Sequence, residues 1–142
     1  MCDPDAPRSF LVCYDGSAES LHALQHACDL SKPQDKLSIM HVSSTALPQE
    51  KQDELKAAAE KELESAGQSF GGGKEYYFEV NDHPGQWLST QCRLLSIDYC
   101  IIGCRGLSGL KKTVLGSVSE SVVHHAPCPV LIVRGTCNPA TV

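Results

Sequence analysis

The 142-residue sequence contains no long apolar segment and no signal for export. Its cleanest apolar runs are as short as VLIV at residues 130–133, whereas a membrane-spanning helix needs about 20 apolar residues. The first ten residues lack the basic and apolar regions of a secretory signal peptide. We therefore expect a cytoplasmic protein that does not bind a membrane.

None of the eight cysteines belongs to a C-x-x-C pair, the spacing typical of many zinc and redox sites. Cys13, Cys100 and Cys128 lie in or beside apolar runs. In a chain without a leader, such cysteines are expected to be small buried residues in a reducing compartment. His22, His26 and Cys28 share a predicted helical region and remain an alternative set of metal ligands.

Acidic residues are in excess overall but missing from one segment. The chain has 17 Asp plus Glu, 12 Lys plus Arg and a formal charge of −5, which argues against a general nucleic-acid or membrane-surface binder. Residues 99–119 contain no acid but include Arg105, Lys111 and Lys112. This cationic segment is therefore where an anion would bind.

Length and pattern predict a single α/β domain spanning residues 1–142, with a core of about 8–135 and short flexible ends. Apolar strands are expected at 9–14, 36–42, 75–80, 98–102 and 130–134. Helices are expected from Ser17 to Pro33, at 49–69, from Pro84, and at 117–125. This alternation predicts a doubly wound five-stranded parallel sheet of order 3-2-1-4-5 with helices on both faces. Ligands of such sheets bind at the carboxyl ends of the strands.

The glycine-rich segment after the fourth expected strand lies at such an end. Gly103 and Gly106 would let backbone N–H groups approach a bulky anion. Gly116 and Ser117 begin the next expected helix, whose unpaired N–H groups favour phosphate. The alternative is a plain crossover loop, because Ser117 and Glu120 also form a capping box that needs no ligand.

The spacing matches neither of the common phosphate-binding motifs. No G-x-x-x-x-G-K-[ST] is present, and no G-x-G-x-x-G follows the first strand. The segment instead resembles the G-2x-G-9x-G-[ST] motif of the ATP-binding universal stress proteins. The resemblance extends from residue 10 to 134 and includes YDGS at 14–17, HV at 41–42, DYCIIGCRGLSGLKK at 98–112 and HHAPCPVLIVR at 124–134.

This resemblance implies a site for ATP, or for AMP or ADP, with Mg²⁺ on the phosphates. Asp15 would bind the ribose or lie near the metal, and the Val42 backbone would meet the adenine. The ribose and phosphates would then contact Gly103, Arg105, Gly106, Gly116, Ser117 and Val118. Asp15 could instead cap a helix or form an Asx turn, Val42 could be an ordinary strand residue, and Arg105 a solvated cation. The sequence departs from the family at Cys13-Tyr14 and Asn81-Asp82, and a Tyr14 side chain facing the ligand would narrow the site.

The leading hypothesis is a nucleotide-binding stress or signalling protein that is not an enzyme, because no catalytic constellation accompanies the loop. The alternatives are a slow ATP hydrolase or phosphotransferase using Asp15, and an interaction module that binds no nucleotide. The apolar last strand, Val130 to Arg134, predicts a homodimer through its edge, unless the tail covers that edge. A redox role for Cys104, beside Arg105, is a further prediction.

Overall fold

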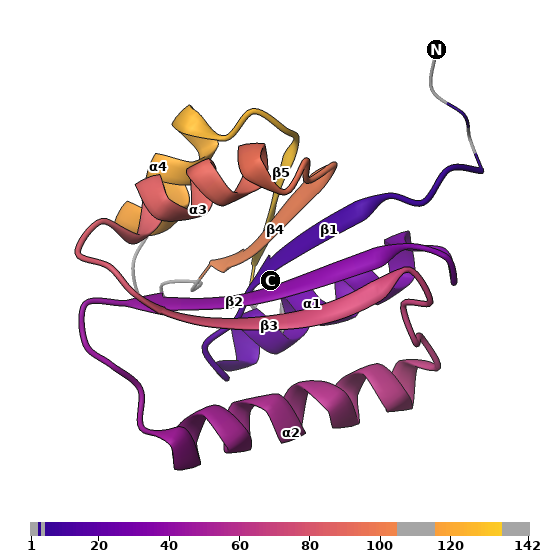
Figure 1. Ribbon diagram of the computed structural model, residues 1–142, viewed down its shortest axis with the longest axis horizontal. Helices are drawn as coiled ribbons and strands as arrows, with labels where there is room; N and C mark the ends of the chain where they lie inside the picture. Colours follow the sequence, from indigo (N-terminus) through magenta and orange to yellow (C-terminus); the bar gives the residue numbers. More distant parts are fainter. Residues whose placement is uncertain (1–2, 4, 105–115, 135–142) are drawn as a thin grey trace, which may run out of the picture.

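The computed structural model describes residues 3, 5–104 and 116–134, which form one five-stranded parallel sheet (Figure 1). The strands are β1 (Ser9–Cys13), β2 (Lys36–Ser43), β3 (Gly73–Val80), β4 (Tyr99–Cys104) and β5 (Val130–Arg134). Their order is β3-β2-β1-β4-β5, and every neighbouring pair is parallel. The predicted fold class and strand order are therefore confirmed.

Four helices cover the two faces of the sheet (Figure 1). Helices α1 (Ala18–Leu30) and α2 (Gln49–Ala66) pack on one face, and α3 (Pro84–Leu94) and α4 (Ser117–His125) on the other. None of the helices in the described part of the chain is both long and apolar enough to cross a membrane.

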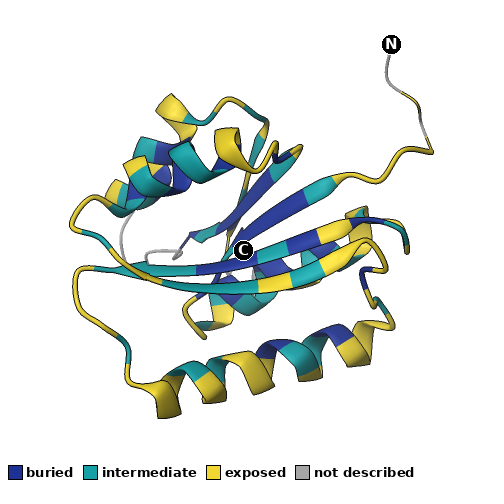
Figure 2. Cartoon of the chain, in the orientation of Figure 1, coloured by how far each residue is buried: buried dark blue, intermediate teal, exposed yellow. Residues whose placement is uncertain are grey.

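The central strand β1 is apolar from Phe10 to Cys13 because both of its faces are covered. Phe10 and Val12 pack in the cluster under α1 and α2, whereas Leu11 packs in the cluster under α3 and α4. Figure 2 shows the resulting buried band through the middle of the sheet. This alternation fixes which residues at the end of β1 face the space between α3, α4 and the sheet.

Several element boundaries differ from the prediction. Helix α2 ends at Ala66, because Gly67 adopts a left-handed C-cap conformation with φ of 71°. Strand β3 begins at Gly73, two residues before its predicted start. Strand β4 continues through Cys104, which makes Gly103 a strand residue paired with Val133 and not part of a loop.

Candidate functional site

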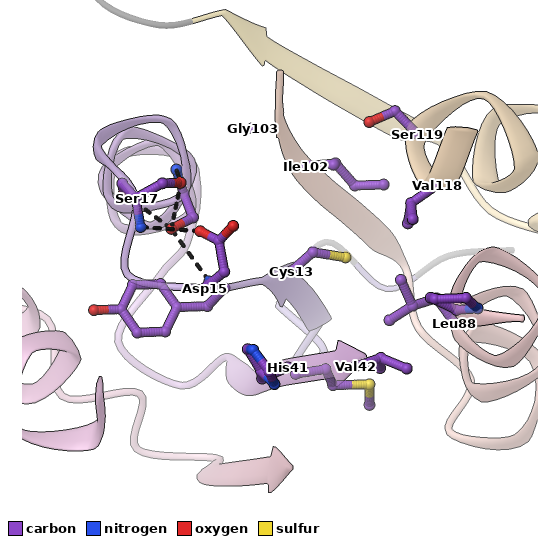
Figure 3. Close-up of a pocket in the computed structure, with 14 residues that line it drawn as sticks. Cys13, Asp15, Ser17, His41, Val42, Leu88, Ile102, Gly103, Val118 and Ser119 are labelled. Atoms are coloured by element: carbon purple, nitrogen blue, oxygen red, sulfur yellow. Dashed lines mark hydrogen bonds between the residues drawn. The ribbon is translucent and has the colours of Figure 1, made fainter. Parts of the chain in front are cut away.

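A pocket of about 190 Å³ opens where the carboxyl ends of β1, β2 and β4 meet the first turns of α3 and α4 (Figure 3). This is the position that a doubly wound sheet offers to ligands. It is lined by Cys13, Tyr14, Asp15, Ser17, Ser20, Met40, His41, Val42, Pro84, Leu88, Ile102, Gly103, Val118 and Ser119.

The polar side of the pocket is built from the turn between β1 and α1. The Asp15 carboxylate accepts a hydrogen bond from the Ser17 backbone N–H at 2.9 Å, which is the geometry of an Asx turn. The hydroxyl of Ser17 in turn caps α1 by accepting from the Ser20 N–H at 3.2 Å. The N-cap role predicted for Ser17 is confirmed, and Asp15 shapes the turn while it borders the pocket.

The charge of Asp15 is maintained by its neighbours. Burial by itself would raise the pKa of this carboxyl group, but hydrogen bonds from Ser17 and Ser20 and the nearby His41 outweigh it, so the pKa of Asp15 is lowered. Asp15 therefore carries a negative charge at neutral pH and is available to a hydroxyl donor or a cation.

The apolar side of the pocket combines side chains from four different elements. Val42 comes from β2, Leu88 from α3, Ile102 from β4 and Val118 from α4. In Figure 3 their side chains lie around one space opposite Asp15. Such a surface suits the flat, apolar face of an aromatic ring.

Tyr14 does not fill this space. Its side chain is 3% exposed and packs in the cluster on the α1 and α2 face, where burial is the largest cause of its raised pKa. Tyr14 thus borders the pocket, but its side chain packs on the other face of the sheet, away from the apolar side of the pocket. Its hydroxyl is buried without a hydrogen-bond partner.

The two described glycines of the motif have different surroundings. A Cβ atom on Gly103 would lie 2.4 Å from the Glu19 carbonyl oxygen and 2.9 Å from the Ser20 nitrogen. Gly103 is thus required for the close packing of β4 against the first turn of α1, whatever the ligand. A Cβ atom on Gly116 would meet none of the described atoms within 4 Å, so packing against the described part of the chain does not require glycine there.

The start of α4 carries no side-chain cap. Gly116 occupies the N-cap position, and its carbonyl accepts from the Glu120 N–H at 2.9 Å. The predicted capping box is therefore wrong, because Ser117 is the first helical residue and its hydroxyl is one position too late to cap the helix. The first backbone N–H groups of α4 have no partner within the helix. They belong to the turn that leads into Ser119, and Ser119 lines the pocket.

The structure brings together part of the predicted site. Asp15, Val42, Gly103 and Val118 line the pocket, and Gly116 and Ser117 precede Val118 at the start of α4. Ser117 borders a second pocket of about 230 Å³ between the starts of α3 and α4. Arg105 and Gly106 lie outside the described residues.

Several pocket residues were not predicted from the sequence. His41 stands beside Val42 in the quoted HV pair, and Cys13 could have been assigned to the pocket face from the alternation along β1. Ser20 and Ser119 carried no signal, because only the packing of α1 and α4 brings them to the pocket. Cys104, for which the sequence predicts a redox role, is buried at the end of β4 and does not line this pocket.

The alternative metal site is not supported. Within the described residues, no group of three or more His, Cys, Asp or Glu side chains is arranged to hold a metal ion. The His22 ring instead donates from Nδ1 to the Arg134 carbonyl oxygen at 2.9 Å, which links α1 to the end of β5.

Comparison with known proteins identifies the family. The model of the universal stress protein family matches residues 7–134, which is most of the chain. The chain belongs to the universal stress protein family. Universal stress protein YxiE of Bacillus subtilis is 34% identical to it over 143 residues, an alignment that covers 87% of this chain and 97% of YxiE.

Solved structures of universal stress proteins share the fold. One in complex with cAMP has a TM-score of 0.69 and 24% identity, covering 93% of this chain and 100% of its own. A family member from Arabidopsis thaliana with AMP bound has a TM-score of 0.63 and 18% identity, covering 94% and 95% of the two chains. At these identities the comparison establishes the architecture, and the nucleotides belong to those proteins.

Proposed function

We propose that the pocket binds an adenosine nucleotide, ATP or its mono- or diphosphate, and that this universal stress protein acts in stress response or signalling through that binding. Structural neighbours of the family bind AMP and cAMP. The adenine would occupy the apolar side formed by Val42, Leu88 and Ile102, with Asp15 facing the ribose hydroxyls.

The observation that carries this proposal is the uncapped start of α4 beside the pocket. Ser, Thr, Asp or Asn at the N-cap would satisfy one of the free N–H groups, but this chain has Gly116 there, and a Cβ atom on it would meet none of the described atoms within 4 Å. Uncapped N–H groups and the positive end of the helix dipole favour a phosphate group.

The volume of the pocket is consistent with a ligand of which only one part lies inside the pocket. Its volume of about 190 Å³ is below the roughly 300–1,000 Å³ of typical ligand sites. A nucleotide would therefore fill it with base and ribose, while the phosphates reach toward Gly116 and Ser117. The ATP-binding motif also includes Arg105 and Gly106, which lie outside the described residues.

Mg²⁺ would accompany a polyphosphate. This ion keeps several water ligands and usually takes only one or two protein carboxylates in addition to phosphate oxygens. Asp15 is the carboxylate that borders the pocket, and its lowered pKa keeps it in the form that binds a cation. The residues present therefore fit Mg-ATP as well as AMP.

We further propose that the protein binds and does not rapidly turn over its ligand. The Asp15 carboxylate already accepts the Ser17 N–H, and its lowered pKa makes it a weak general base. The phosphotransferase alternative would need Asp15 to take a proton or a phosphoryl group. Multiple-turnover kinetics with Mg-ATP separate the two.

We also propose that the protein forms a homodimer through β5. Both β3 and β5 are outer strands, but β3 carries Lys74, Glu75 and Glu79, and such charges discourage edge pairing. β5 has the uncharged run VLIV, and its Leu131 side chain is 38% exposed. A second copy is the partner that would match this apolar edge in length and character.

The simplest test of nucleotide binding uses the untreated purified protein. The sample is denatured, and the released small molecules are separated and identified by mass spectrometry. We expect ATP, ADP or AMP, or an empty protein that binds them in a calorimetric titration. A protein that neither releases nor binds an adenosine nucleotide would leave the interaction module as the better function.

A further inference from the structure

Four cysteines lie together as a chain of thiols in the core on the α3 and α4 face of the sheet. Cys92 and Cys100 are buried there, and Cys13 and Cys128 pack against the same cluster. The chain begins at the pocket with Cys13 and ends at Cys128, which is half-buried between α4 and β5. This arrangement joins β1, α3, β4 and the last connection of the fold.

The chemistry open to this chain is that of thiols and not of metal ligands. Within the described part of the protein, no set of three or more His, Cys, Asp or Glu residues is placed to bind a metal ion. Cys13, Cys92, Cys100 and Cys128 are free thiols. Reactivity then depends on which thiol a reagent can reach and on how readily it ionises.

The three thiols beyond Cys13 are poor nucleophiles. The neighbouring Cys100 thiol, together with burial, raises the pKa of Cys92, and the neighbouring Cys13 thiol is the largest cause that raises the pKa of Cys100. Burial raises the pKa of Cys128 to about 12. At neutral pH these groups stay protonated, whereas the thiolate is the reactive form.

Cys13 differs from them in position. It is the member of the chain that lines the pocket, and it is only half-buried. Figure 3 shows its sulfur directed into the space between β1 and the side chains of Leu88 and Val118. A small molecule that enters the pocket therefore meets this thiol.

We propose that Cys13 is a modification site inside the pocket, where a low-mass disulfide such as glutathione disulfide adds one thiol group and blocks ligand binding. The Cys13 sulfur attacks one sulfur of the reagent, a new S–S bond forms, and the S–S bond of the reagent breaks. The other half leaves as a thiol and takes up the proton from Cys13. The site stands on this geometry, and only the blocking of a nucleotide rests on the function proposed above.

The reaction should stop at the mixed disulfide. Cys13 pairs with Ile102 in the sheet and Cys100 with Leu11, so the two cysteines are diagonal neighbours offset by two residues. A strand spacing of about 4.8 Å and a rise of about 3.3 Å per residue place their Cα atoms roughly 8 Å apart. A disulfide usually spans about 4.4–6.8 Å between Cα atoms, so closure to Cys100 would require β1 and β4 to move.

The experiment treats the reduced, native protein with millimolar glutathione disulfide at about pH 8, maps the adduct by peptide mass spectrometry, and measures AMP binding by calorimetry before and after. We expect a glutathionyl group on Cys13 and a loss of AMP affinity of at least about tenfold, reversed by dithiothreitol. Prior addition of saturating AMP should slow the modification of Cys13.

Matched variants show which cysteine is responsible for the loss of AMP affinity. Cys28 is half-buried on α1, where burial raises the pKa of its thiol to about 11, and C28A should retain the sensitivity of the wild type. In C13A, or in C13S if C13A folds poorly, affinities before and after treatment should agree. An adduct confined to other cysteines, or modified Cys13 with unchanged AMP affinity, would overturn the proposal. If the untreated protein binds no AMP, the proposed function fails, and the adduct map alone decides whether the modification site exists.

Discussion

Gly103 and Gly116 belong to one sequence motif, but the structure gives them different roles. A Cβ atom on Gly103 would overlap the backbone of Glu19 and Ser20, whereas a Cβ atom on Gly116 would meet none of the described atoms within 4 Å. We expect Gly103→Ala to lower the free energy of unfolding by about 3 kcal/mol, because backbone atoms cannot move aside cheaply. Gly116→Ala should cost less than about 1 kcal/mol. Urea unfolding of both variants measures these free energies. Equal losses in the two variants would contradict the close approach of β4 to α1.

Asp15 gives the folded protein a predictable dependence on pH. Its pKa is lowered by its hydrogen bonds and by His41 despite burial, so the folded state binds this proton less tightly than the unfolded chain. The stability from the ionised carboxylate is therefore fully present above the unfolded pKa of about 3.9 and is lost as the pH falls through the lower folded value.

Asp15→Asn keeps the acceptor of the Asx turn but removes the charge. The stability difference between wild type and variant should be constant near neutral pH and shrink as the pH falls below about 4. Urea unfolding at a series of pH values measures it. A difference that grows on acidification would mean that the pKa of Asp15 is raised in the folded protein.

At the scale of elements, Gly85 fixes the approach of α3 to α4. A Cβ atom there would lie 2.4 Å from the Ser121 Cβ and 3.3 Å from the Val118 carbonyl oxygen. Gly85→Ala should therefore destabilise the protein by about 1–2 kcal/mol, even though alanine is the better helix former. Because both helices border the pocket, their separation would also widen the ligand site.

A double-mutant cycle tests this packing. Ser121→Gly removes the opposing Cβ, so the double variant should be more stable than the sum of the single effects by at least about 1 kcal/mol. Ser65→Gly on the exposed side of α2 is the control, since it has no contact with Gly85 and should show no coupling. Additive behaviour at Ser121 would contradict the close contact.

Element order, strand order and helix faces were predictable because the apolar periods of strands and helices are local. The role of Gly103 was not predictable, because the backbone atoms that require a glycine there belong to Glu19 and Ser20 in α1, more than eighty residues away in the sequence. The prediction of a capping box was wrong because the S-x-x-E pattern does not tell whether its serine is the N-cap or the next residue. In this structure Gly116 is the N-cap. Ser20 and Ser119 reach the pocket only through tertiary packing.

At the scale of the whole molecule, the exposed apolar residues of β5 predict assembly. Leu131→Glu places a charge on the proposed dimer edge and should shift the protein toward the monomer in sedimentation velocity at tens of micromolar. Leu94→Glu, at a more exposed apolar position on α3, is the control and should leave the association state unchanged. A wild-type protein that sediments only as a monomer would remove the dimer hypothesis.

The central claim, that the pocket and the start of α4 bind an adenosine nucleotide, is tested most directly by ligand-dependent stability. At a hundred times its Kd, a ligand that binds only the folded state adds about 2.7 kcal/mol, so Mg-ATP or AMP should raise the melting temperature by several degrees. Gly116→Val should melt near the wild type without ligand, because a Cβ atom at this position meets none of the described atoms within 4 Å, but should lose most of the rise. Sodium chloride at matched ionic strength is the control. An unchanged melting temperature with millimolar nucleotide, in wild-type protein shown to be free of bound nucleotide, would contradict the account.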